Sequence, residues 1–222
     1  MKKEIESDNL FEEKDHKQVE LILLRGMEDL PDTVSGIIAN SLGARPFNSN
    51  WFDKPKEDLR TKLHRLDQVV DEARNNGKQV IFIGVSAGAA LAMAYMIENP
   101  NKIRHVFSLS GLLNIDLKTQ DLTHLTKASS SFKEIAEFLD KKLTPKVKNR
   151  LHLPDKVSAY SSPEGKDTTV PYSAAQPAWL KKENQRFIGN ANNAPDHASA
   201  IAQTLLVNIR NQLDQLSEAK FG

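Results

Sequence analysis

A serine flanked by glycines stands near the centre of the sequence, in the pentapeptide 84–88 (Gly-Val-Ser-Ala-Gly). The apolar run 80–83 precedes it and is β-branched or aromatic throughout, which favours a strand. The run 87–96 follows and is rich in Ala, Leu and Met, which favours a helix. A sharp turn between such a strand and helix exposes a serine hydroxyl above the strand end. We therefore predict that Ser86 is a nucleophile; the alternative is a glycine-rich junction with an incidental serine.

A serine hydroxyl needs a base to remove its proton, and the base is usually a histidine. His197 stands between the predicted last strand and last helix, so it emerges at the same edge of the sheet as Ser86. We predict that His197 is the base. The other histidines lie in a charged tail, on a helix, in a strand or in an irregular segment: His16, His64, His105, His124 and His152.

The histidine in turn needs a carboxylate to orient it. The loop 161–171 follows the preceding predicted strand and holds two acidic residues, Glu164 and Asp167. We predict that Asp167 is the acid, and Glu164 is its competitor. A plain solvated turn is the alternative for both residues.

These motifs resemble those of the α/β-hydrolase superfamily. The resemblance rests on the segments GVSAGAALAMAY, DTTVP and NAPDHASAI, and it covers nearly the whole chain after residue 18. The order Ser86, Asp167, His197 matches the serine–acid–histidine order of that fold. The resemblance implies a small, minimal serine hydrolase, esterase-like, with a short lid or none. It also implies that the first two strands of the family's sheet are absent.

The tetrahedral intermediate of acyl transfer carries a negative oxygen, which needs N–H donors. One donor should be the backbone N–H of Ala87, directly after the nucleophile. The resemblance places the second donor in the loop 25–27 after the first strand, and we assign it to the N–H of Met27. Arg25 stands in that loop, where the family often has His-Gly or His-Gly-Gly-Gly, which argues against assigning the chain to a particular lipase or esterase subfamily.

The remaining patterns predict a single α/β domain whose mostly parallel sheet of about six strands carries helices on both faces. Residues 1–17 form a charged tail, and 18–222 form the α/β-hydrolase domain. The segment 111–154 is an elaborated crossover with one helix at 132–143, and a partial lid is the alternative. The expected strands are 18–24, 44–47, 80–83, 105–109, 157–160 and 186–188, and the other expected helices are 31–42, 55–77, 87–97 and 198–216.

Composition excludes several classes of protein. Thirty basic and twenty-nine acidic residues nearly cancel, so nothing suggests a nucleic-acid or membrane-surface partner. The chain has no cysteine, which excludes disulfides, thiolate catalysis and zinc–cysteine sites. The uncharged run 80–97 is long enough to span a membrane, yet its change in composition at Gly84 favours a buried strand and helix. We expect a cytoplasmic protein.

The sequence therefore predicts a serine hydrolase that cleaves carboxylic esters of small or medium acyl groups through an acyl-enzyme. The same three residues would serve a thioesterase, a peptidase or an amidase. A non-catalytic binding protein on the same fold is the remaining alternative. We expect a small-molecule acyl substrate, no cofactor and no metal, and no nucleic-acid or membrane partner; the oligomeric state is open.

Overall fold

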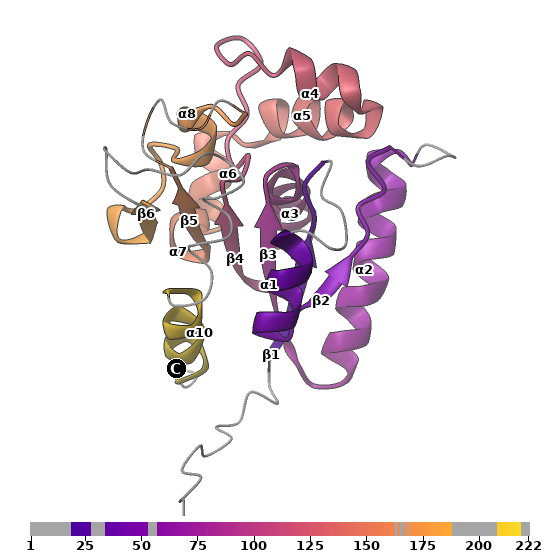
Figure 1. Cartoon of the computed structure of the whole chain (residues 1–222), viewed down its shortest axis with the longest axis vertical. Coiled ribbons are helices and arrows are strands. Elements are labelled where there is room, and N and C mark those ends of the chain that lie inside the picture. Colours follow the sequence, from indigo (N-terminus) through magenta and orange to yellow (C-terminus); the bar gives the residue numbers. More distant parts are fainter. Residues whose placement is uncertain are drawn as a thin grey trace, which may run out of the picture.

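The protein is built on one parallel six-stranded sheet with the strand order β2-β1-β3-β4-β5-β6. The computed structural model describes residues 19–27, 34–52, 57–162, 164, 167, 169–187 and 208–218. Within these residues the predicted fold class is confirmed, and each strand lies within two residues of its predicted position. The strands are β1 (Val19–Leu24), β2 (Arg45–Phe47), β3 (Gln79–Val85), β4 (Ile103–Leu109), β5 (Val157–Ser161) and β6 (Gln185–Phe187) (Figure 1).

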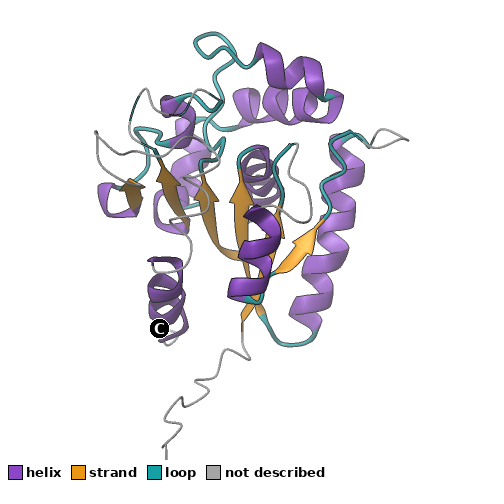
Figure 2. Cartoon of the chain, viewed as in Figure 1, coloured by secondary structure: helices purple, strands orange, loops and turns teal. Residues whose placement is uncertain are grey.

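Helices cover both faces of this sheet (Figure 2). Alternate side chains of each strand point to opposite faces, so the apolar strands supply two separate cores. One core lies under α1 (Val34–Leu42) and α10 (Asn208–Glu218) and includes Leu23, Ile81 and Ile209. The other lies under α2 (Leu59–Asn75), α3 (Ala87–Glu98) and α5 (Ser130–Lys142), and includes Ile22, Phe82 and Leu66.

The uncharged run 80–97 forms the centre of the molecule. It divides into β3 and α3 at Ser86, as predicted, and every one of its residues is buried. The helix packs between the sheet and α5, which explains why it is apolar all round. Among the described residues, no helix is long and apolar enough to cross a membrane.

The segment 111–154 connects β4 to β5 and contains more helix than predicted. Besides α5 it forms α4 (Thr123–Ala128), α6 (Pro145–Arg150) and α7 (Leu153–Lys156). The sequence analysis missed these three because helices of one or two turns show too little periodicity to recognise. Figure 1 shows α4 and α5 beyond the carboxyl ends of β3 and β4. The partial-lid alternative stays a prediction, as do the domain boundaries.

Three further points complete the comparison with the expected elements. The short elements α8 (Tyr172–Ala175) and η2 (Lys182–Asn184) precede β6 and were also missed. The predicted tail 1–17, where the family's first two strands would lie, falls outside the described residues. The same holds for the starts of the first and last predicted helices, at 31–33 and 198–207.

Two glycines allow α3 to approach the sheet closely. A methyl group on Gly88 would lie 2.1 Å from the carbonyl oxygen of Leu24 at the end of β1. A methyl group on Gly84 would lie 2.5 Å from the Cα atom of Ala89. Both contacts are with backbone, which cannot rotate away. Packing of the helix against the strand ends therefore requires both glycines of the GVSAG motif.

We expect Gly88→Ala to lower the free energy of unfolding by about 3 kcal/mol or more, because overpacking against backbone has no cheap relaxation. Urea denaturation followed by circular dichroism measures this. Ala90→Gly, on the same helix, serves as the control and should cost about 1 kcal/mol, since it changes helix propensity and one methyl group. Equal losses in the two variants would contradict the packing constraint.

Candidate active site

Ser86 occupies the turn between β3 and α3 in a conformation that few residues adopt. Its φ is 50° and its ψ is −119°, although it is not glycine. Serine at the amino end of a helix normally accepts a hydrogen bond from the first turn through its hydroxyl. The Ser86 side chain makes no such capping bond. The positive φ of Ser86 is therefore backbone strain at the turn, and the hydroxyl is not used to cap the helix.

Hydrogen bonds to the Ser86 backbone hold this conformation in place. The Ser86 N–H donates to the carbonyl oxygen of Leu109, at the end of β4, over 3.0 Å. The Ser86 carbonyl oxygen accepts from Ala89 at 3.1 Å and from Leu112 at 3.2 Å. Strained backbone persists only where its surroundings over-determine it. Here the next strand and the loop beyond it supply that support.

The loop after β1 passes directly beside the serine side chain. A methyl group on Gly26 would lie 3.1 Å from Cβ and 3.8 Å from Oγ of Ser86. Met27, the predicted second oxyanion donor, is the next residue along this loop. Within the described part of the chain, no hydrogen bond occupies the N–H of Ala87 or of Met27. Ala87 follows Ser86 in the chain and Met27 follows Gly26, which lies against Ser86, so both N–H groups are candidates for the oxyanion.

The two acidic candidates differ in their surroundings. Asp167 follows β5 and is half-buried, and its Oδ1 accepts from the N–H groups of Thr169 at 2.8 Å and Val170 at 3.0 Å. These bonds orient the carboxylate within its loop, at the edge of the sheet where Ser86 also lies. Glu164 is exposed. The described contacts favour Asp167 over Glu164 as the residue with a set orientation.

The predicted base, His197, lies outside the described residues, so its distance from Ser86 stays untested. Of the described histidines, His64, His124 and His152 are exposed on helices or at a helix end, on α2, on α4 and before α7. His105 lies near the amino end of β4, beside Ile81 of β3, whereas Ser86 follows the carboxyl end of β3. His105 therefore lies at the other end of β3 and β4 from Ser86.

Sequence reasoning missed a set of contacts on the carbonyl oxygen of Arg25, which begins the loop beside Ser86. The indole Nε1–H of Trp51 donates to this oxygen over 3.0 Å, and the Ser49 hydroxyl donates over 3.3 Å. The only signal in the sequence is a tryptophan soon after a short strand. That signal could not have identified its acceptor, because the two segments are more than twenty residues apart.

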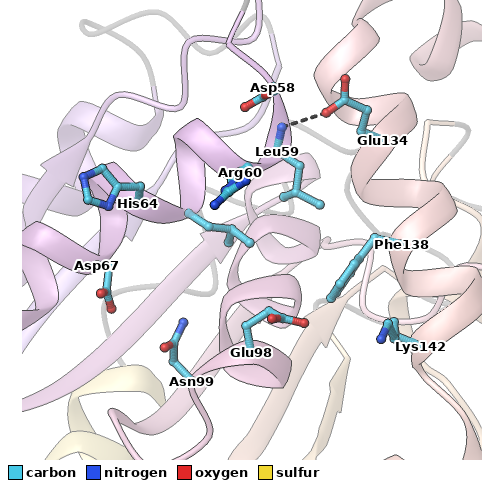
Figure 3. A pocket seen from close by; sticks show the side chains of 11 residues that line it. Asp58, Leu59, Arg60, His64, Asp67, Glu98, Asn99, Glu134, Phe138 and Lys142 are labelled. Atoms are coloured by element: carbon cyan, nitrogen blue, oxygen red, sulfur yellow. Dashed lines mark hydrogen bonds between the residues drawn. The ribbon is translucent and has the colours of Figure 1, made fainter.

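A surface cavity of about 680 Å³ lies elsewhere, between α2, the carboxyl end of α3, and α5. Figure 3 shows Glu134 of α5 facing the start of α2, where its carboxylate accepts from the Leu59 N–H over 2.7 Å. Glu98 and Asn99 line the cavity at the opposite end of α3 from Ser86. The cavity is thus separate from the Ser86 site. No group of three or more metal-binding side chains occurs among the described residues.

Comparison with known families decides the relationship. A family model described as phospholipase/carboxylesterase matches residues 9–141, more than half of the chain. The protein belongs to this family of α/β-hydrolases. The match includes Ser86 and the loop 25–27, and it ends before Asp167 and His197. The protein is accordingly a hydrolase.

Solved structures show the same fold in proteins of distant sequence. A structure reported for the metagenome-derived lipolytic enzymes LipS and LipT has a TM-score of 0.61 and 11% identity, covering 90% of this chain and 94% of that one. A membrane phospholipase A gives 0.57 and 13%, covering 92% and 81%. The pyrethroid hydrolase PytH gives 0.56 and 12%, covering 91% and 98%. A comparison with curated proteins gives no match.

The buried His105 should make this hydrolase sensitive to acid. Its ring nitrogen lies 2.9 Å from the Ser158 hydroxyl, and burial, with a smaller effect of the Arg104 charge, lowers its pKa to about 4. The unfolded chain, with an ordinary histidine pKa of about 6.5, therefore binds more protons below that pH. We expect the free energy of unfolding to fall by about 2 kcal/mol between about pH 7 and pH 5.

Urea unfolding at the two pH values measures this effect. His105→Gln removes the titrating ring, so it should lose that part of the pH dependence. His64→Gln, at an exposed position, should keep the dependence of the wild type. The same slope in all three proteins would contradict the assignment to His105.

Proposed function

We propose that the protein is a serine hydrolase that cleaves carboxylic esters of small or medium acyl groups. The observation that carries the proposal is the strained Ser86, with its hydroxyl released from its helix and the loop after β1 beside it. An incidental serine at a glycine-rich junction has no need of a φ of 50° supported by hydrogen bonds from two segments. The family's description as phospholipase/carboxylesterase favours an ester as the substrate.

In the proposed mechanism His197 takes the proton of Ser86 as Oγ attacks the ester carbonyl carbon. The N–H groups of Ala87 and Met27 stabilise the negative oxygen, each contributing about 3 kcal/mol to lowering the barrier. His197 then gives its proton to the leaving alcohol, and an acyl-enzyme forms on Ser86. Water then gives a proton to His197 and attacks the carbonyl carbon of this ester. His197 returns the proton to Ser86 Oγ as the bond to the acyl group breaks, and the acid is released. Every step is acyl transfer and proton transfer, so the chemistry uses no redox partner.

Asp167 orients His197 in this mechanism and stabilises the imidazolium. Its Oδ1 is held by the backbone N–H groups of Thr169 and Val170, which sets the direction of the carboxylate before a substrate binds. A preset carboxylate costs no reorganisation during the reaction. Glu164, on the same loop, is exposed to solvent.

The first experiment treats the full-length protein with a fluorophosphonate probe and locates the adduct by mass spectrometry. We expect one adduct per chain, on Ser86, and none in Ser86→Ala. Hydrolysis of p-nitrophenyl esters of increasing chain length then defines the acyl group, and matched thioesters and amides test the alternative leaving groups. Failure to label a folded wild type would contradict the proposal and favour a binding protein on this fold.

The second experiment tests the acid. We expect Asp167→Asn to lower kcat by about three to four orders of magnitude, because the imidazolium loses its counter-charge. Asparagine keeps an Oδ1 that can accept from Thr169 and Val170, so the loop should still fold. Glu164→Gln is the matched control and should change kcat less than two-fold. The reverse pattern would transfer the role to Glu164.

A further inference from the structure

The loop 48–52, called here the tryptophan loop, follows β2 and holds the start of the loop beside Ser86. Trp51 and Ser49 both donate to the carbonyl oxygen of Arg25, over 3.0 Å and 3.3 Å. Both side chains are buried, with 9% and 1% of their surface exposed. The Arg25 carbonyl is partly buried, and two hydrogen bonds from buried side chains restrict its direction more than one would.

A buried lysine fixes the tryptophan loop from the side of α2. Lys62 of that helix is fully buried, and its ammonium group donates to the carbonyl oxygens of Ser49 and of Asn50, the latter over 2.7 Å. The same ammonium lies 5.3 Å from the centre of the Trp51 ring and 3.6 Å from the Glu57 carboxylate. Burying an ammonium is costly unless it is paired and hydrogen-bonded, and here the loop supplies those partners.

The direction of the Arg25 carbonyl determines where the next peptide groups lie. In a planar trans peptide the C=O and the following N–H point in opposite directions. Holding the Arg25 oxygen on the tryptophan loop therefore directs the Gly26 N–H away from that loop. Only the φ and ψ angles of Gly26 separate this peptide from the N–H of Met27. Gly26 itself lies against Ser86, since a methyl group in place of its hydrogen would be 3.1 Å from the Ser86 Cβ.

We propose that Trp51 and Ser49 are positioning residues for the oxyanion donor of the loop 25–27, and that Lys62 sets the loop that carries them. The proposal rests on the proposed function, because an oxyanion exists only if Ser86 attacks a carbonyl. Donors stabilise an oxyanion fully only when they are aimed before the reaction. Two donors on one carbonyl supply that aim from outside the site.

A purely structural role for Trp51 is the competing explanation. The Trp51 ring packs edge-on against Phe132 of α5 at 6.1 Å between centres, and its carbonyl oxygen accepts from the Ser129 hydroxyl at 3.0 Å. These contacts attach the tryptophan loop to the helices beyond the sheet edge. Substitution of Trp51 by phenylalanine keeps an aromatic ring for Phe132 and for Lys62. It removes the indole N–H, so it separates the two roles.

Trp179 provides a matched control. Its Nε1–H donates to Oδ1 of Asn114 over 3.1 Å, and the Lys148 ammonium lies 5.6 Å from its ring centre. Trp179→Phe, like Trp51→Phe, therefore removes an indole hydrogen bond from a ring that lies beside a lysine ammonium group. Unlike Trp51→Phe, it leaves the hydrogen bonds to the Arg25 carbonyl unchanged. Thermal unfolding of both variants measures the common structural cost.

With p-nitrophenyl acetate as substrate, we expect Trp51→Phe to lower kcat about ten-fold. This is a smaller fall than the roughly 10²–10³-fold reduction in kcat that removal of a whole oxyanion donor causes, because the donor is still present but less well aimed. Both acylation and deacylation pass through an oxyanion, so the burst rate and the steady-state rate should fall together. KM should change less than two-fold, and the pH profile should not move, because the acid and base are untouched. Ser49→Ala should give a smaller fall, and Trp179→Phe none.

Hydrogen exchange of the peptide 19–27, followed by mass spectrometry, tests the positioning without turnover. We expect faster exchange in this peptide for Trp51→Phe and for Lys62→Met, and unchanged exchange for Trp179→Phe. If Lys62→Met does not fold, Trp51→Phe and Ser49→Ala still decide the matter. Unchanged exchange in Trp51→Phe, or equal kinetic losses in both tryptophan variants, would overturn the inference. An inactive wild type would instead contradict the proposed function, while the exchange result would still show whether the loop is held.

Discussion

The close approach of α3 to the ends of β1 and β3 is the constraint on which the site depends. It requires glycine at positions 84 and 88, since a methyl group at either would collide with backbone. The same approach compresses the turn at Ser86 into a positive φ, which the hydrogen bonds to Leu109 and from Leu112 and Ala89 maintain. Strain of this kind costs on the order of 1–3 kcal/mol and survives only where neighbouring structure outweighs it. The apolar strands and the helix α3, which is buried from Ala87 to Ile97, supply that excess of stability.

A second feature of the molecule is a polar network set inside the apolar core. Lys62 is buried beside the tryptophan loop, yet its ammonium meets carbonyl oxygens, a carboxylate and an aromatic face. Apolar side chains of similar volume often stabilise a core as well as or better than a buried charge does. A buried charge is better explained by the geometry it imposes, and here that geometry ends at the Arg25 carbonyl beside Ser86. His105 is also buried, but it differs from Lys62 because burial lowers its pKa and keeps the ring neutral.

Most of the fold was predictable because its elements are long and strongly patterned. The segments around Ser86 differ in composition, since the one before it is β-branched or aromatic and the one after it is rich in Ala, Leu and Met. The helices α2 and α5 carry the apolar stripe that is typical of a helix on one face of a sheet. The helices α4, α6 and α7 were not predicted, since helices of one or two turns show too little periodicity to recognise. The turn at Ser86 was predictable, since the flanking strand and helix place Ser86 between them. Asp167 and Glu164 share one loop, and their sequence alone does not separate them.

By itself the sequence determined the fold class, the strand–turn–helix at Ser86 and the loop from which an acid would come, because these follow from local periodicity and chain order. The tertiary structure alone decided that Gly26 lies against Ser86. It also decided that Glu164 is exposed whereas Asp167 is oriented by backbone N–H groups. Only the tertiary structure shows that Trp51 and Ser49 hold the Arg25 carbonyl. The physical reason is that most of these contacts join segments far apart in the chain. A hydrogen bond between such segments leaves no periodic trace in either of them, and it exists only once the sheet has brought their ends together.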